Sequence, residues 1–197
     1  MTETSDDGRL ARGQRTREAV IDALFDLYAE GNLTPTIEDI ASRVGRTTRS
    51  IYTHFQDKEA LAVAMAERLL ELHGELFRAR PLTGTQTQRI DGIAAHRAEF
   101  YETVAPVRRS TLVRIHRSPE LQQQQAFLAA HFRKQLTRTF EHELSTLDDD
   151  VAAEVLELLD LHTSWETWDR LHVWQKLPVD TSRKIVTGLI RQALRRR

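Results

Sequence analysis

The stretch TIEDIASRVGRTTRSIYTHFQDKEAL, residues 36–61, determines how the first part of this chain folds. Thr36 is followed three residues later by Asp39, which is the spacing of a capping box at a helix N-terminus. Apolar residues then recur at helical spacing, and Gly45 stands where a left-handed residue ends a helix. The pattern predicts one short helix that begins after Thr36 and ends before Gly45.

A second short helix is predicted directly after this glycine. Thr47 can cap it, and its apolar side consists of Ile51 and Phe55, four residues apart. Asp57 can cap the longer helix that follows. Two short helices joined by a tight turn predict a helix-turn-helix over residues 36–55.

The polar residues of the second helix suit contact with duplex DNA. A helix that enters the major groove needs a packed inner face and an outer face whose side chains reach bases or phosphates. Arginine can bind guanine through two hydrogen bonds, and tyrosine, histidine and lysine can bind phosphates. Arg43, Arg46, Arg49 and Lys58 against Asp57 give this segment a net charge of +3. A solvated helix with unrelated charges is the alternative. The outward-facing residues are Thr48, Arg49, Ser50, Tyr52 and Thr53.

Composition limits the other classes of function. Of 197 residues, 40% are hydrophobic and 29% are charged, and the net charge is −1, so the chain is globular and any DNA binding rests on a local patch. The absence of cysteine excludes disulfides, thiolate catalysis and cysteine-bound zinc. The polar N-terminus lacks the apolar core of a signal peptide, and no apolar run is long enough for a membrane span. We therefore expect a cytoplasmic protein without a membrane partner.

Helical spacing continues along the rest of the chain, and no segment alternates as a strand would, so the predicted fold class is all-α. Residues 1–12 are expected to form a flexible arm. The first helix is expected to begin at Thr16, and Asp180 is expected to cap the last one. The longer helices in between are expected over residues 58–79, 86–104, 107–116, 119–146 and 149–177.

The opening stretch closely resembles the N-terminal domain of TetR-family transcriptional regulators. The resemblance is carried by Thr36–Ala41, Val44–Gly45, Ser50–Phe55 and Asp57–Leu61, whose spacing matches the family without a gap. Beyond this stretch, only the succession of long helices is similar. The resemblance implies a DNA-binding domain over residues 13–73 and an effector-binding and dimerisation domain over residues 74–197.

The resemblance also assigns roles to single residues. It implies base contacts by Thr48, Arg49 and Ser50. It implies phosphate contacts by Tyr52, His54 and Lys58. Arg46 departs from the small apolar residue usual in the family, so it points outward or adds a backbone contact. Arg49 stands where Gly, Pro or Ala is common, which suggests a direct guanine contact. Glu38 makes the start of the first short helix the least suitable DNA contact. The predicted DNA-binding residues are Thr36, Arg46, Thr47, Thr48, Arg49, Ser50, Tyr52, Thr53, His54 and Lys58.

The family resemblance further implies a homodimer and a ligand cavity. The predicted dimer interface consists of Leu158, Ile185, Val186, Leu189, Ile190, Ala193 and Leu194, and packing within one chain is the alternative for this stripe. The cavity would be enclosed by helices between residues 86 and 168 and bind a mostly apolar small molecule with one or two polar groups. Each candidate can also be an ordinary core residue. The effector-binding candidates are His96, Phe100, Leu112, His116, Phe127, His131, Trp165 and Trp168.

The predicted function is a bacterial transcription regulator, most simply a repressor that binds a palindromic operator as a homodimer and is released by a small effector. One alternative is a helical interaction protein that keeps the fold without binding DNA. A metal-dependent helical enzyme is the other. The sequence His142-Glu143 begins like a zinc motif, but Thr146 stands where the second histidine would be. We therefore expect neither an enzyme nor a cofactor or metal.

Overall fold

The computed structural model describes residues 3–196, with the backbone alone for residues 3–10, 58 and 59. No strand occurs among these residues, so the predicted all-α class is confirmed. Two irregular turns interrupt the helices, a 3-10 turn at Ile115–Arg117 and a π-helical turn at Arg170–Trp174. The helices are α1 (Glu3–Ala29), α2 (Ile37–Arg43), α3 (Thr48–His54), α4 (Lys58–Phe77), α5 (Gln86–Arg114), α6 (Pro119–Thr139), α7 (Glu141–Leu144), α8 (Asp149–His162), α9 (Trp165–Asp169) and α10 (Val179–Ala193).

The chain divides into two compact units. The first contains the residues up to Gly74 together with Ala105–His116, and the second contains Glu75–Val104 and the residues from Arg117 onward. The helices α4 and α5 therefore each contribute to both units. The sequence did not indicate that the end of α5 groups with the N-terminal helices.

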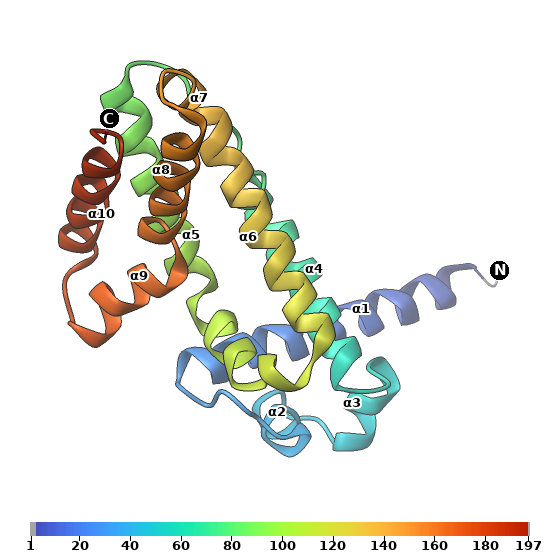
Figure 1. Ribbon diagram of the computed structural model, residues 1–197. Helices are drawn as coiled ribbons and strands as arrows, with labels where there is room; N and C mark the ends of the chain where they lie inside the picture. Colours follow the sequence, from blue (N-terminus) through green and yellow to red (C-terminus); the bar gives the residue numbers. More distant parts are fainter. Residues whose placement is uncertain (1–2, 197) are drawn as a thin grey trace. The chain divides into compact units, whose positions relative to one another are not determined.

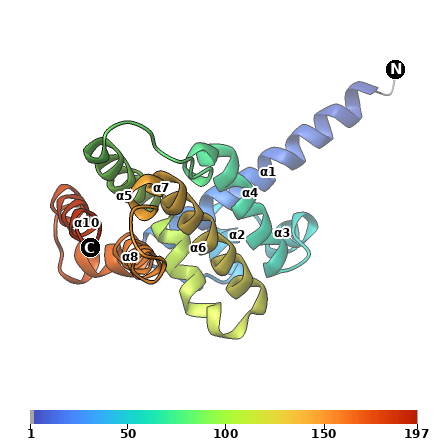
Figure 2. The same cartoon turned by 45° about the horizontal axis from the view of Figure 1, so that its top comes forward.

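In the first unit, α1, α2 and α3 pack pairwise around one hydrophobic core (Figure 1). The N-terminal turns of α1 extend beyond α2 and α3 (Figure 2). The core is completed by the start of α4, which contributes Leu61, Ala64 and Met65. The largest fully buried residues of α1 to α3 and of the C-cap of α3 are Val20, Ile40, Ile51 and Phe55.

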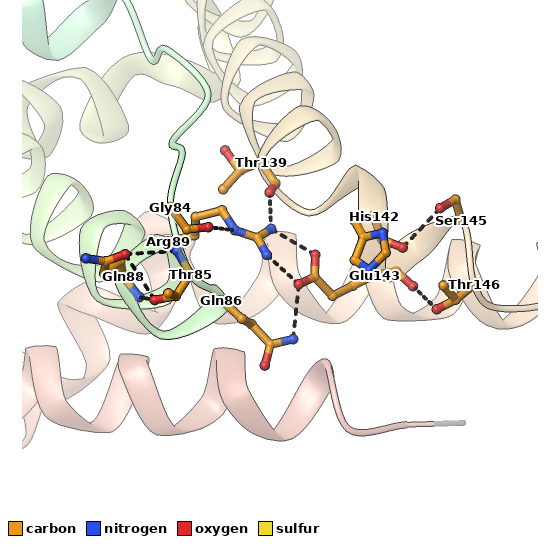
Figure 3. A network of polar contacts seen from close by, with 10 residues as sticks. All are labelled: Gly84, Thr85, Gln86, Gln88, Arg89, Thr139, His142, Glu143, Ser145 and Thr146. Atoms are coloured by element: carbon orange, nitrogen blue, oxygen red, sulfur yellow. Dashed lines mark hydrogen bonds and ion pairs between the residues drawn. The ribbon is translucent and has the colours of Figure 1, made fainter.

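In the second unit, α8 packs against both α6 and α10, as Figure 1 shows. An ion pair connects the start of α5 with the corner between α6 and α7 (Figure 3). Arg89 Nη2 donates to Glu143 Oε1 at 2.6 Å and Arg89 Nη1 to Glu143 Oε2 at 2.8 Å, and both side chains are only 13% exposed. Arg89 Nη1 also donates to the Thr139 carbonyl at 2.5 Å. These bonds lower the pKa of Glu143 and raise that of Arg89.

Two helices extend further than the sequence predicted. The first begins at Glu3 and not at Thr16, because a helix fixed by packed turns adds each further residue for one more hydrogen bond. The helix expected to end before Pro106 continues as α5 to Arg114. A proline inside a helix removes one hydrogen bond, and here the buried Val104 and Ala105 precede it directly.

Other helices are interrupted where the sequence predicted continuity. The helix expected over 119–146 ends at Thr139, because Phe140 leaves helical geometry. The helix expected over 149–177 breaks after His162, because Ser164 accepts a hydrogen bond from Thr167 N and caps the new helix α9. The helix α4 ends at Phe77 and has a kink at His73.

The predicted cap of the last helix was also wrong. The helix α10 begins at Val179 after Pro178, and Asp180 lies within its first turn. Its carboxylate accepts a hydrogen bond from Arg183 instead of capping the helix. Within the described part of the chain, no helix has the length and apolarity that crossing a membrane requires.

Candidate nucleic-acid interface

The start of α2 is fixed by the predicted capping box. Asp39 N donates to Thr36 Oγ1 at 3.1 Å, and Thr36 N donates to Asp39 Oδ2 at 2.8 Å. These hydrogen bonds lower the pKa of Asp39. Both partners lie within one turn of the same chain segment, so the residue spacing alone was enough to predict the bonds.

The turn between α2 and α3 has the predicted left-handed residue. Gly45 has a φ of +62°, a conformation that favours a residue without Cβ. Arg46 N donates back to the Ala41 carbonyl at 2.9 Å, which closes the end of α2. Thr47 Oγ1 then accepts from Ser50 N at 3.2 Å and caps α3 as predicted. The start of α3 is therefore fixed by backbone and cap together.

The inner face of α3 is anchored by the two predicted residues. Ile51 is 0% exposed and Phe55 is 2% exposed. The sequence did not identify Arg17 of α1, whose guanidinium lies 4.7 Å from the centre of the Phe55 ring. Arg17 Nη1 also donates to the His54 carbonyl at 3.3 Å, at the last residue of α3. Arg17 thereby connects α1 to both the anchor and the C-terminal end of α3.

The outer side of α3 bears polar side chains. Tyr52 is 54% exposed, and Arg49 and Thr53 are also exposed. Thr53 Oγ1 donates to the Arg49 carbonyl at 3.0 Å. The remaining candidates divide into exposed Thr36, Arg46 and Thr47 and half-buried Thr48, Ser50 and His54, while the side chain of Lys58 lies outside the described residues.

The positive charge around α3 is smaller than the sequence suggested. Arg43 donates to both carboxylate oxygens of Glu30, at 2.9 and 2.5 Å, so its charge is balanced by the residue that directly follows α1. Arg46 and Arg49 have no hydrogen bond or ion pair from their side chains to any described residue. The charges available to a polyanion are therefore concentrated at the turn and the first part of α3.

Six of the eight effector-binding candidates belong to one connected set of aromatic rings in the second unit. In the second unit, the rings of His96 and Phe100 are stacked, with centroids 6.4 Å apart, and both contact Phe132. Trp165 and Trp168 contact Tyr101, whose ring centroid lies 5.6 Å from that of Phe100, so they join the same set of rings. The sequence did not identify Phe132 and Tyr101, which connect these candidates.

Of the other four candidates, His131 contacts the buried Phe132, with ring centroids 6.3 Å apart, and thereby joins these rings. Phe127 is 73% exposed and stacks on His131, with ring centroids 6.3 Å apart. His131 Nε2 is 3.1 Å from the Arg78 carbonyl. Leu112 and His116 belong to the first unit. The sequence pattern thus grouped residues that occupy different environments.

The predicted dimer stripe divides into two rows. Val186, Ile190 and Ala193 are at most 2% exposed, on the side of α10 that packs within the chain. Ile185 is 36% exposed, and Leu189 is half-buried. Leu158 and Leu194 are half-buried too. The packing within one chain that the sequence left open therefore accounts for the buried row, and the outer row stays a candidate interface.

No group of three or more histidine, aspartate or glutamate side chains is arranged to hold a metal ion among the described residues. The arrangement that remains is a short, capped and anchored helix with hydroxyl, phenol and guanidinium groups on its outer side. Such a helix can enter a major groove and form hydrogen bonds with bases and phosphates.

Comparison with known proteins shows similar chains. Residues 20–65 match the sequence profile of bacterial regulatory proteins, tetR family. The transcriptional regulators TtgR and ArpR, both from Pseudomonas putida, are each 30% identical over 118 residues, which cover 48% of this chain and 56% of each relative. The matched region therefore spans little more than half the length of these relatives.

A solved structure shares the fold over almost the whole chain. A crystal structure of a protein from Rhodococcus sp., assigned to the TetR family of transcriptional regulators, matches with a TM-score of 0.61. The match covers 90% of this chain and 98% of that protein, at 15% sequence identity. At this identity the likeness concerns the fold alone.

Proposed function

We propose that this chain is a repressor of the TetR family of bacterial regulatory proteins and that it binds operator DNA through α3. The observation that carries the proposal is that α3 has a buried anchor on its inner side and arginines without acidic partners near its outer side. Ile51 and Phe55 fix α3 from within, and Arg46 and Arg49 have no acidic partner among the described residues. Repression follows most simply, because occupying an operator is enough to block polymerase.

The residues divide by role in this proposal. Arg49, with Thr48 and Ser50, contacts bases at the N-terminal end of α3, where recognition helices usually reach the base edges. Tyr52 and His54 contact phosphates, which position the protein without selecting sequence. Lys58 is assigned to phosphate as well, from its place at the start of α4.

The proposed active form is a homodimer. The outer row of α8 and α10 supports this, because Leu161 is 59% exposed and Ile185 is 36% exposed beside the half-buried Leu158 and Leu189. A two-fold dimer would read a palindromic site whose half-sites are ~34 Å apart or a further helical turn away. Sedimentation of Ile185→Asp should give a single chain where the wild type gives two. The exposed neighbour Lys184, changed to aspartate, is the matched control and should leave two.

A small molecule that binds in the second unit is proposed to release the DNA. Both curated relatives are named as transcriptional regulators, which supports a regulatory and not an enzymatic role. The buried aromatic residues around Phe100 and Trp168 are the candidates for its apolar contacts. An effector that binds the DNA-free form more tightly than the DNA-bound form weakens operator binding. The factor of weakening equals the ratio of the effector's two affinities.

The direct test is selection from sheared genomic DNA with the full chain at low and moderate salt. We expect enrichment of fragments that share a palindrome, and a footprint on two adjacent major grooves. The affinity should fall with salt, because phosphate contacts release counterions. If no fragment is enriched even at low salt, the proposed function is wrong.

A further inference from the structure

The second unit contains a buried arginine that has no acidic partner. Arg97 is 1% exposed, and none of its nitrogens forms an ion pair with any carboxylate of the described residues. Two turns earlier on the same helix, Arg89 is bound by both oxygens of Glu143. Burying a charge without a partner is costly, and buried arginines are normally paired. Arg97 is the exception to this rule within α5.

The hydrogen bonds of Arg97 occupy one side of its guanidinium. Nη1 lies 2.8 Å from His96 Nδ1 and donates to Gln135 Oε1 at 2.8 Å. Nη2 has one long bond, 3.5 Å to the Phe132 carbonyl, and Nε has no partner. The Nε–Nη2 edge, which offers two parallel N–H groups, is therefore largely unused. This is an edge with which arginine binds a carboxylate through two hydrogen bonds.

The groups that hold Arg97 are themselves fixed. His96 Nε2 lies 2.9 Å from the Leu76 carbonyl, so Nε2 carries the proton and Nδ1 is the acceptor for Arg97. Burial and the charge of Arg97 lower the pKa of His96 to about 4, which keeps the ring neutral. Gln135 Nε2 donates to the Arg80 carbonyl at 2.7 Å. The guanidinium is thus held in one orientation by neutral acceptors.

The nearest acidic influence does not fill this edge. Asp160 attracts Arg97 only through longer-range Coulombic interaction, and its Oδ2 lies 3.8 Å from Arg133 Nη1. Burial lowers the pKa of Arg97 to about 10, so the group still carries its charge at neutral pH. An anion would balance this charge.

An aromatic ring covers the same group and is packed against further rings. The Arg97 guanidinium lies 3.9 Å from the centre of the Phe132 ring. Phe100 contacts Phe132 and Phe77 edge to face, with ring centroids 4.8 and 5.1 Å away. Such surroundings suit a flat apolar ligand, and a flat carboxylate can use both N–H groups of the unused edge.

We propose that the second unit binds an aromatic carboxylate, whose two oxygens accept hydrogen bonds from Nε and Nη2 of Arg97. This inference rests on the proposed function, which it deepens by naming the chemical class of the effector. Sequence reasoning predicted a mostly apolar ligand with one or two polar groups, and Arg97 supplies the partner for one of them.

The test is calorimetric titration of the full chain with benzoate, phenylacetate and 1-naphthoate, each against its neutral amide at matched ionic strength. At least one acid should bind at least tenfold more tightly than its amide. Arg97→Gln should abolish this preference, and Arg97→Lys should weaken binding about tenfold, because an ammonium lacks two parallel donors. Arg133→Gln is the matched control, since Arg133 already binds Glu157, and it should change nothing.

A second measurement uses the wild type alone, in case a variant does not fold. The 15N-labelled Nε–H resonance of Arg97 should shift when the acid is added and stay in place with the amide. Equal binding of acids and amides, no binding of any acid, or an unmoved resonance would overturn the inference. Acid binding by a chain that enriches no genomic fragment would leave this site intact and refute the proposed regulatory function.

Discussion

The surface of α3 and the cluster around Arg97 both contain arginine guanidinium groups, but one exposes them and the other buries them. On α3, arginines and hydroxyls lie outside a buried anchor, and the capping bonds join residues three apart. Around Arg97, the charge lies inside, and its hydrogen-bond partner Gln135 is 38 residues away. An exposed site depends on a local scaffold, whereas a buried site depends on partners brought together by the fold.

The first prediction concerns the anchor of the exposed site. Phe55→Ala should lower the free energy of unfolding by ~3–5 kcal/mol, because it removes a buried ring and the contact with Arg17. Tyr52→Ala, on the outer side of the same helix, should change it by less than ~0.5 kcal/mol. Urea unfolding measures both. Equal losses would show that α3 has no distinct inner and outer face.

The second prediction concerns a long-range contact. Glu143→Gln should cost ~1.5–3 kcal/mol, because it weakens charge-assisted bonds between α5 and α7. Since Arg89 lowers the folded-state pKa of Glu143, this contribution is complete above the unfolded value of ~4.3 and is lost as pH falls through the lowered folded value.

Thermal unfolding from pH 7 downward should therefore show the wild type and Glu143→Gln converging in acid. Glu154→Gln is the control, because Glu154 is exposed and pairs with Arg196 at the surface. It should have little effect at any pH. A difference between wild type and Glu143→Gln that stays constant with pH would argue against the ion pair.

The third and smallest prediction concerns the local cap. Thr36→Ala should cost ~1 kcal/mol, because Asp39 N loses its acceptor at the start of α2. Thr36→Ser keeps the hydroxyl and should keep most of the stability. The measurement is again the urea midpoint, and a loss as large with serine as with alanine would exclude the hydroxyl as the cause.

The sequence predicted those features whose causes are local. The Thr36–Asp39 box, the left-handed Gly45, the Thr47 cap and the buried pair Ile51 and Phe55 were all confirmed. Each depends on residues within one or two turns, so their spacing contains the information. The all-α class was predicted from the helical spacing of apolar residues along the chain, and it was confirmed too.

The sequence failed where distant contacts decide the structure. It did not predict that α5 would continue through Pro106 or that Phe140 would interrupt a helix. It also counted Arg43 as available charge, although Glu30, directly after α1, balances it. The interruption at Ser164 was missed although its cause is local, because the residue whose N–H it caps is only three positions away.

Two arginines have a sequence signal that the residue spacing does contain. Arg17 precedes the buried Val20 and Ile21 by one helical turn, and Arg97 lies between the buried Ile93 and Phe100. A charged residue in register with an apolar stripe indicates a buried or aromatic-bound cation. The partners of that cation cannot be read from the stripe, because they come from other helices.

The most direct test of the account compares two arginines of the helix-turn-helix on a selected operator and its single-base variants. Arg49 has no partner among the described residues, whereas Arg43 is bound to Glu30. The account predicts that Arg49→Ala reduces discrimination at one base pair by ~1–3 kcal/mol and that Arg43→Ala leaves every base preference unchanged. Unchanged base preferences in Arg49→Ala, or equal effects of the two substitutions, would contradict it.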